Sequence, residues 1–156
     1  MIKTRRLNIY PASNEQMKRM IDEEIIPELK AAYQEMLLGC LAHPNDRVWY
    51  TIWNLELNDK SGAIVGNLSF KGIDEDGLVE IGYGTYPEYE GQGFMTEAVT
   101  AVVRWVANQP CVHRIEAEAE ENNSASIRVL QKAGFIPNGK FGNECPRFMF
   151  SSSIYN

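Results

Sequence analysis

The chain has 156 residues, 44% of them hydrophobic and 23% charged, and its formal net charge is −6. This length predicts one domain over residues 1–156 with a sizeable core, and the acidic balance excludes nucleic acid as a main partner and favours a cationic one. No apolar run approaches the ~20 residues of a membrane helix, the N-terminus has no apolar signal region, and three widely spaced cysteines indicate reduced thiols, so we expect a cytoplasmic protein without membrane contact.

The N-terminal third predicts one strand followed by two helices. Thr4–Tyr10 alternates apolar and polar residues, as a half-buried strand does. Ser13 and Gln16 match a capping box that opens a short helix through about Asp22. Pro27 suits the first position of a second helix, whose apolar stripe we interpret as core packing, with a contribution to a substrate pocket as the alternative. That stripe consists of Leu29, Ala32, Tyr33, Met36, Leu37 and Cys40.

Three antiparallel strands are expected next. Val48–Leu57 and Ala63–Lys71 are the first two, and a loop at Asn58–Gly62 separates them. Asp74–Gly77 then turns the chain into the third strand, which begins at Leu78.

The rest of the chain is organised around Leu78–Asn108, which predicts a strand, a glycine loop and a helix. Gly91 and Gly93 remove side chains where the backbone turns tightly or approaches a ligand. Thr96 is the predicted N-cap of the helix. Bare N–H groups of residues 91–96 would then point out of the helix start, which is an arrangement that binds anions and above all phosphate. Taken alone, the motif fits an ordinary strand-to-helix turn better.

The C-terminal third predicts a strand, a helix and a hairpin. The strand is Val112–Glu120, and the strand–helix–strand unit that it completes predicts a parallel pair joined by a right-handed crossover. The helix is Ser124–Ala133, with Gly134 at its end. Phe135–Pro137 and Cys145–Ser152 form the expected final hairpin.

Four stretches resemble the GNAT superfamily of N-acetyltransferases. Asn123–Phe135 reads Asn-x-x-Ser-x-x-Val-Leu-x-Lys-x-Gly-Phe, which closely resembles the family's helix and following strand. Gly82–Ala98 looks like the loop that binds the acetyl-CoA pyrophosphate, and Thr4–Pro11 and Gly62–Phe70 fit the branch that includes ribosomal-protein N-terminal acetyltransferases. The resemblance implies an α+β fold: a mostly antiparallel twisted sheet with one parallel strand pair around the cofactor, and helices on both faces.

The resemblance also implies a site for acetyl-CoA as cosubstrate. Backbone groups of Tyr83, Gly84 and Thr85 would bind the pantetheine arm. Asn123 would contact the same arm, and it could also simply cap the helix that follows. Ser126 would lie near the cofactor sulfur. The pyrophosphate would bind the backbone N–H groups of Gly91, Gln92, Gly93, Phe94, Met95 and Thr96.

The sequence departs from the family pattern at three positions. Glu90 stands where the loop has Gln or Arg, and Met95 stands where it has Gly or Ala. Because the loop acts mainly through backbone N–H groups, we expect cofactor binding to survive. Leu130 stands where many relatives carry a tyrosine general acid, so that role is vacant or belongs to another residue.

The chemistry needs a base for the amine and a donor for the leaving sulfur. We favour Glu118 as the base, because it lies five residues before Asn123, and Glu80 as the second choice. The alternative is that Glu116, Glu118, Glu120 and Glu121 form one solvated acidic strand edge. Ser126 is the expected donor to the sulfur, which needs little help because a thiol has a pKa of about 8.5. A backbone N–H group of residues 83–85 would stabilise the oxyanion.

The expected function is acetyl-CoA-dependent N-acetyl transfer to a primary amine by direct attack in a ternary complex. The acceptor would be a peptide N-terminus or a small molecule such as an aminoglycoside, a polyamine or an amino acid. The alternative is a CoA-binding sensor without transferase activity. A nucleotide site is disfavoured because the glycine loop lacks the Lys-Ser/Thr of a P-loop.

The sequence does not identify the acceptor or the oligomeric state. Because proteins of the family that it resembles are often dimers, a homodimer is one possible state. Met17–Asn45 and the last hairpin would build the acceptor site. Tyr33, Tyr86 and Trp53 are candidate lining residues, with ordinary core or surface packing as the alternative. No metal site is expected, because the only histidines, at positions 43 and 113, are isolated.

Overall fold

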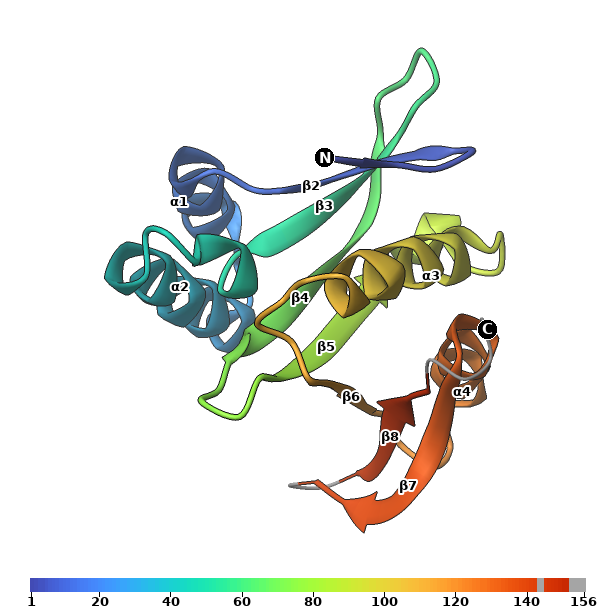
Figure 1. Ribbon diagram of the computed structural model, residues 1–156. Coiled ribbons are helices and arrows are strands. Elements are labelled where there is room, and N and C mark those ends of the chain that lie inside the picture. The colour runs from blue at the N-terminus through green and yellow to red at the C-terminus, as the bar shows by residue number, and fades with distance from the viewer. Residues whose placement is uncertain (143–144, 152–156) are drawn as a thin grey trace.

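A computed structural model describes residues 1–142 and 145–151 of the chain (Figure 1). These residues form one mixed sheet with the strand order β1-β2-β3-β4-β5-β6-β8-β7, in which only β5 and β6 run parallel. The strands are β1 (Ile2–Lys3), β2 (Leu7–Pro11), β3 (Ile52–Leu57), β4 (Ile64–Ile73), β5 (Leu78–Thr85), β6 (Arg114–Glu118), β7 (Phe135–Phe141) and β8 (Pro146–Phe150). The helices are α1 (Asn14–Glu23), α2 (Pro27–Ala42), α3 (Phe94–Ala107) and α4 (Ser124–Ala133). The predicted α+β fold class with one parallel pair is confirmed.

Helices cover both faces of the sheet, as expected. Consecutive residues of a strand point to opposite faces of the sheet, so the contacts of Ile52 and Trp53 identify the helices that cover each face. Trp53 packs on Trp105 of α3, with ring centroids 5.1 Å apart. Ile52 packs with Met17 of α1 in a separate apolar cluster. The α3 face therefore holds the main core, and α1 and α2 cover only part of the opposite face.

The capping box of α1 forms as predicted. The Gln16 backbone N–H donates to Ser13 Oγ at 3.1 Å, and the Ser13 N–H donates to Gln16 Oε1 at 2.8 Å. Pro27 is the first residue of α2. The core-packing interpretation of the α2 stripe holds only in part, because Cys40 alone is fully buried and Leu29 is 43% exposed. The reason is that α2 packs mainly on α1 and contributes only Tyr33, Met36 and Leu37 to the small cluster on this face of the sheet.

Several strand boundaries differ from the predicted ones; the first predicted strand, for example, runs over Leu7–Pro11 and not over Thr4–Tyr10. The first residues of Val48–Leu57 belong to a 3₁₀ turn (Arg47–Trp49), held partly by the Trp53 indole, which donates to the Val48 carbonyl at 2.9 Å. The strand predicted at Val112–Glu120 is shorter at both ends, and β7 extends beyond Pro137. Residues 143–144 of the last loop, and residue 152 of the predicted last strand, lie outside the described residues.

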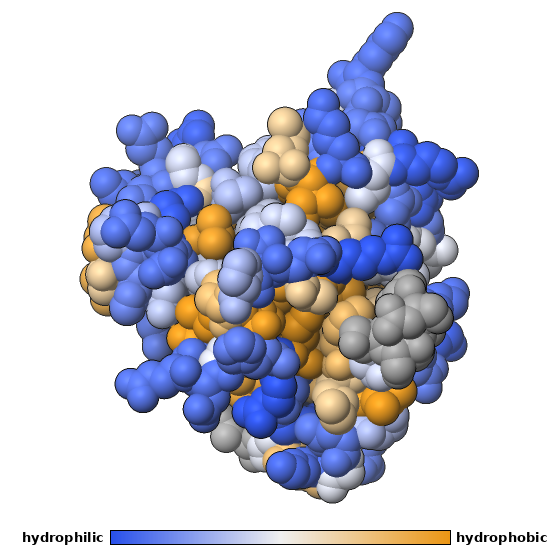
Figure 2. Space-filling view, in the orientation of Figure 1, coloured by the Kyte–Doolittle hydropathy of each residue, from blue (hydrophilic) through white to orange (hydrophobic). Residues whose placement is uncertain are grey.

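The parallel pair is short, and this creates a split in the sheet. Strand β5 pairs with β6 only from Leu78 to Glu80, opposite Arg114 to Glu116. Beyond that point β6 pairs with β8 instead, so in the described ranges the edge of β5 over residues 81–85 faces no strand. In Figure 1, β6, β8, β7 and α4 form a block beside the one built on β1–β5. Figure 2, in the same orientation, shows apolar residues in the middle of the visible surface, between hydrophilic ones.

Candidate active site

The start of α3 presents a row of free backbone donors. Helix α3 begins at Phe94 with Gly93 as its N-cap, so the prediction of Thr96 as N-cap is wrong. The reason is that Gly91 and Gly93 have φ of +73° and +79°, which lets the chain turn directly into the helix. Across the described part of the chain, no protein acceptor takes a hydrogen bond from the N–H groups of residues 91–96. Together with the helix dipole, these groups can bind an anion.

Arg6 braces this loop and was missed in the sequence. Its Nη1 donates to the Gln92 carbonyl at 2.9 Å, and its guanidinium lies 4.4 Å from the Phe94 ring centroid. Its Nε donates to Glu97 Oε2 at 2.7 Å. The only sequence feature that pointed to Arg6 was the pair of adjacent arginines after Thr4. A contact between residues 91 positions apart cannot be predicted from local sequence patterns.

Glu97 joins the N-terminal segment to α3. Besides Arg6, it accepts a hydrogen bond of 2.6 Å from the Thr4 hydroxyl. Burial alone would raise the pKa of the Glu97 carboxyl, but the hydrogen bonds from Thr4 and Arg6 outweigh it and lower that pKa. Glu97 therefore stays ionised and fixes Arg6 beside the free donors.

Across the split, a pair of hydroxyl groups connects β5 to α4. Tyr83 Oη lies 3.0 Å from both the carbonyl oxygen and Oγ of Ser126. Burial raises the pKa of Tyr83, and the hydrogen bond to Ser126 opposes this only partly. Asn123 caps α4 by accepting the Ser126 N–H at 3.1 Å, so its predicted capping role is confirmed. Leu130 is fully buried in the main core.

Both candidate bases bind one guanidinium. Arg147 on β8 donates to Glu116 at 2.7 Å, to Glu118 at 2.6 Å and to Glu80 at 3.2 Å, and Lys71 also pairs with Glu80. Burial opposes the charge of Arg147, but the hydrogen bond to Glu116 and the neighbouring carboxylates outweigh it and raise the pKa of Arg147. Glu116 and Glu118 are thus ion-paired and mostly buried, whereas the alternative interpretation expected them to be solvated.

Glu118 is also covered from one side. The backbone of Gly142 approaches it so closely that any side chain at position 142 would overlap its carboxylate. Glu120 and Glu121 are exposed and do not join the Arg147 cluster, so the four acidic residues do not form one edge. The structure therefore brings Glu118 and Glu80 together on Arg147 at the start of the split: Glu80 ends the parallel pair, and Glu118 lies two residues beyond that pair on β6.

Of the three aromatic candidates for the acceptor site, one lines a hollow. Trp53 is buried between Phe70 and Trp105 and is a core residue. Tyr86 is 38% exposed and lines a hollow of about 250 Å³ between α1, β3 and β4. Tyr33 packs partly buried against the α1 cluster, and burial raises its pKa.

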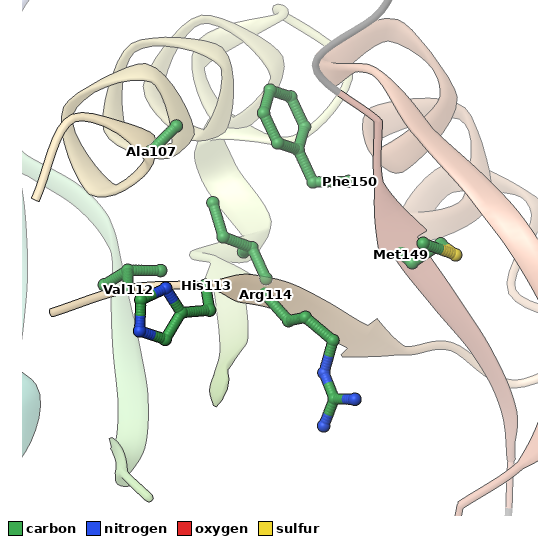
Figure 3. A pocket seen from close by; sticks show the side chains of 7 residues that line it. Ala107, Val112, His113, Arg114, Met149 and Phe150 are labelled. Carbon is green, nitrogen blue, oxygen red and sulfur yellow. The ribbon is translucent and has the colours of Figure 1, made fainter. Parts of the chain in front are cut away.

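A second hollow, of about 200 Å³, lies at the start of β6, at the end of the strand away from the split (Figure 3). Ala107, Val112 and Phe150 contribute apolar surface to it, while the Arg114 side chain points away in Figure 3. It adjoins the paired start of β5 and β6, not their split, and so we do not assign it to the active site.

In residues 1–142 and 145–151, no three His, Cys, Asp or Glu side chains come together as metal ligands. His43 stacks on Tyr50, with ring centroids 4.4 Å apart, and His113 is exposed. None of the described helices is long and apolar enough to cross a membrane.

Comparisons with known proteins agree with this architecture. Residues 6–136 match the family model described as the acetyltransferase (GNAT) domain. The uncharacterized N-acetyltransferase YjdG of Bacillus subtilis (strain 168) is 38% identical over 78 residues, which are 49% of this chain and 46% of that protein. The ribosomal protein uS5-alanine N-acetyltransferase of Escherichia coli (strain K12) is 34% identical over 59 residues, which are 38% of this chain and 30% of that protein. The chain thus matches less than half the length of these relatives.

Solved structures resemble almost the whole chain. RimL, a ribosomal L7/L12 alpha-N-protein acetyltransferase in complex with coenzyme A, aligns with a TM-score of 0.70 at 18% identity, covering 94% of this chain and 93% of that one. The aminoglycoside acetyltransferase AAC(6')-Ib in complex with coenzyme A aligns with a TM-score of 0.69 at 20% identity, covering 96% of both chains. At these identities, the likeness establishes the fold alone.

Proposed function

The chain belongs to the acetyltransferase (GNAT) domain family, and we propose on that premise that it transfers the acetyl group of acetyl-CoA to a primary amine. The observation that carries the proposal is the row of free N–H groups at residues 91–96, at the start of α3. Such a row suits the pyrophosphate of a coenzyme. We further propose that residues 1–156 act as one domain in the cytoplasm.

The free edge of β5 continues from this loop and would hold the pantetheine arm. Tyr83, Gly84 and Thr85 have no partner strand on the β6 side among the described residues, so their backbone groups can bind an extended ligand there. Asn123 lies across the split at the start of α4. Glu90 and Met95, the departures from the family loop, leave the backbone donors intact, since the donors do not depend on side chains.

Acetyl-CoA supplies a thioester, whose carbonyl carbon the acceptor amine attacks. The C–N bond forms and the C–S bond breaks, so one proton must leave the nitrogen and one must reach the sulfur. We assign the first proton to Glu118, with Glu80 as the second candidate, and the second to the Ser126 hydroxyl. A backbone N–H group of residues 83–85 would stabilise the oxyanion.

A second candidate function is a CoA-binding sensor without transferase activity. Arg147 favours it, because it already binds both candidate bases. Leu130, in the place of a tyrosine acid, favours it too. For the transferase, the acceptor remains either a peptide N-terminus or a small-molecule amine.

The test is a panel of amines with acetyl-CoA, read as thiol release and acetylated product. A transferase gives both in equal amounts with at least one acceptor. CoA binding by calorimetry without product from any class of amine would support the sensor instead. If CoA did not bind at all, both functions would be wrong.

A further inference from the structure

The hollow beside Tyr86 lies on the sheet face opposite α3, and α1 forms one of its walls. Gln16 and Arg19 of α1 line it on one side, and Asn54 of β3 lies at its base. Asn54 pairs across the sheet with Asn67 of β4, which pairs in turn with Gly84 of β5. Because neighbouring strands lie about 4.8 Å apart, Asn54 is about 10 Å from the free edge of β5.

Asn54 is a buried polar residue without an internal partner. It is 9% exposed, and in the described part of the chain nothing donates to or accepts from its carboxamide. Among the described residues, every side-chain nitrogen or oxygen that is sealed from solvent has a hydrogen-bond partner. Because the Asn54 carboxamide has none, its atoms must reach solvent, and they do so through the hollow that Asn54 lines. A buried amide that is left unpaired costs free energy, and such groups usually have a ligand or a water as partner.

Beyond Asn67, the strand that borders the split leaves open space on the same face as Asn54. A Cβ atom added at Gly82 or Gly84 would meet nothing within 4 Å, and neither residue has a positive φ. The fold therefore does not require glycine at these positions, and glycine inside a strand weakens it. A strand glycine without a local reason often marks the close approach of a ligand.

We propose that the hollow is the subsite for the body of the acceptor, and that Asn54 binds a neutral group that both donates and accepts hydrogen bonds, such as a peptide unit. This rests on the proposed function, because the reacting amine is placed at the free edge of β5. The separation of about 10 Å corresponds to about three residues of extended chain, so the acceptor is an extended peptide-like amine.

A polycation fits the hollow less well. Arg19 and Glu23, one turn apart on α1, bring both signs of charge to its rim, and its base is a neutral carboxamide. A carboxamide offers a donor and an acceptor side by side, which match the C=O and N–H of a peptide unit. A row of carboxylates would be the expected lining for a polyamine.

The test compares three probes on the CoA-loaded protein: trialanine amide, octylamine of similar length, and spermidine. Binding is measured by calorimetry and, where turnover occurs, kcat/KM is measured as well. Asn54→Leu should weaken trialanine amide about 3–10-fold, the usual effect of losing one neutral hydrogen bond, and should leave octylamine unchanged. The matched control is Asn8→Leu. Asn8 lies on β2, on the same face of the sheet as Asn54, but does not line the hollow.

Thermal unfolding of Asn54→Leu gives a second readout. Because the carboxamide has no partner in the fold, replacing it with an apolar side chain of similar size should leave Tm unchanged or higher. A variant that failed to fold would show that Asn54 serves the core, which would overturn the proposal.

Other outcomes separate this inference from the proposed function. If amines are acetylated but Asn54→Leu changes all probes equally, or spermidine is preferred, the inference is wrong and the transferase stands. If no amine is acetylated but trialanine amide binds in an Asn54-dependent way, the hollow stands as a peptide-binding site, and the transferase, together with the acceptor role of the hollow, is wrong. Failure of trialanine amide to bind the wild-type protein would also overturn the inference.

Discussion

The phenol oxygen of Tyr83 lies 3.0 Å from the hydroxyl oxygen of Ser126, across the split between β5 and β6. Tyr83 stands on the strand whose free edge would carry the cofactor, and Ser126 stands in the first turn of α4. Burial keeps the Tyr83 phenol protonated by raising its pKa. The contact therefore fixes the position of the Ser126 hydroxyl oxygen and places a second protonated hydroxyl group beside it, where Leu130 offers none.

The first prediction concerns this pair. Ser126→Ala should lower kcat by less than the ~10²-fold expected for a lost general acid or base, because a thiolate leaves readily. Tyr83→Phe should lower kcat to a smaller extent, with CoA affinity nearly unchanged. Since Tyr83 acts through Ser126, the double variant should be no slower than Ser126→Ala alone. Additive losses in the double-mutant cycle would mean that the two hydroxyl groups act independently.

The second prediction concerns the base. Glu118→Gln should lower turnover by about 10²–10⁴-fold and most strongly at low pH, where free amine is scarce. CoA affinity should change little. The measurement is a pH–rate profile for Glu118→Gln and Glu80→Gln on one good acceptor.

Arg147 makes this comparison informative, because both variants lose a contact with the same guanidinium. A purely structural effect would therefore appear in both profiles at every pH. A wild-type profile for Glu118→Gln with collapse in Glu80→Gln would move the base to β5. Two unchanged profiles would mean that the amine loses its proton in solution and that the enzyme acts by positioning alone.

The third prediction tests the anion site with a matched pair of charges. Gln92→Glu adds a negative charge beside the free donors, whereas Gln109→Glu adds the same charge at the far end of α3. Each glutamine donates to a backbone carbonyl of an earlier residue, so the lost contact is similar. Calorimetry should show CoA binding weakened about two- to fivefold by Gln92→Glu only. Equal affinities for the two variants would contradict the site.

This pair is a better test than a bulky residue at Gly93. The φ of +79° strains any side chain there, and a Cβ atom would lie 3.4 Å from Arg6 Nη2. Loss of CoA binding in Gly93→Val would therefore report local distortion as much as a blocked phosphate site.

The fourth prediction concerns acid. Because the folded-state pKa of Glu97 is lowered, its contribution to stability is complete above its unfolded pKa of about 4.3 and is lost as the pH falls through the folded value. Glu97→Gln should therefore cost about 1–2 kcal/mol of unfolding free energy at pH 7, and the difference from wild type should shrink below about pH 4. Denaturant unfolding at both pH values measures this, with the exposed Glu75→Gln as control. A difference that stays constant with pH would show that the Glu97 charge does not matter.

Local features of the fold and the one parallel strand pair were predictable, and contacts between side chains far apart in the sequence were not. The capping box at Ser13 and the Asn123 cap depend on neighbours within three residues, so the sequence alone identifies them. The N-cap at Gly93 was missed, because a positive φ can replace a side-chain cap and leaves no polar signature.

The site was predictable to the same extent. The glycine loop is local and was identified, although the contact of Arg6 with it was not. The pairing of Arg147 with Glu80 and Glu118 depends on β8 lying beside β6, which residue patterns do not reveal. Asn54 gave no signal, because its burial comes from α1 closing over the second face of the sheet.

The most direct test of the central claim follows an isotope-labelled acetyl group from acetyl-CoA, with both substrates varied. Direct transfer in a ternary complex predicts that the label appears on the acceptor amine in equal amount to released CoA thiol, with intersecting initial-rate lines and no labelled protein when the acceptor is left out. Labelled protein with parallel lines would contradict direct attack. Bound CoA with no labelled amine across peptide and small-molecule acceptors would contradict the transferase itself.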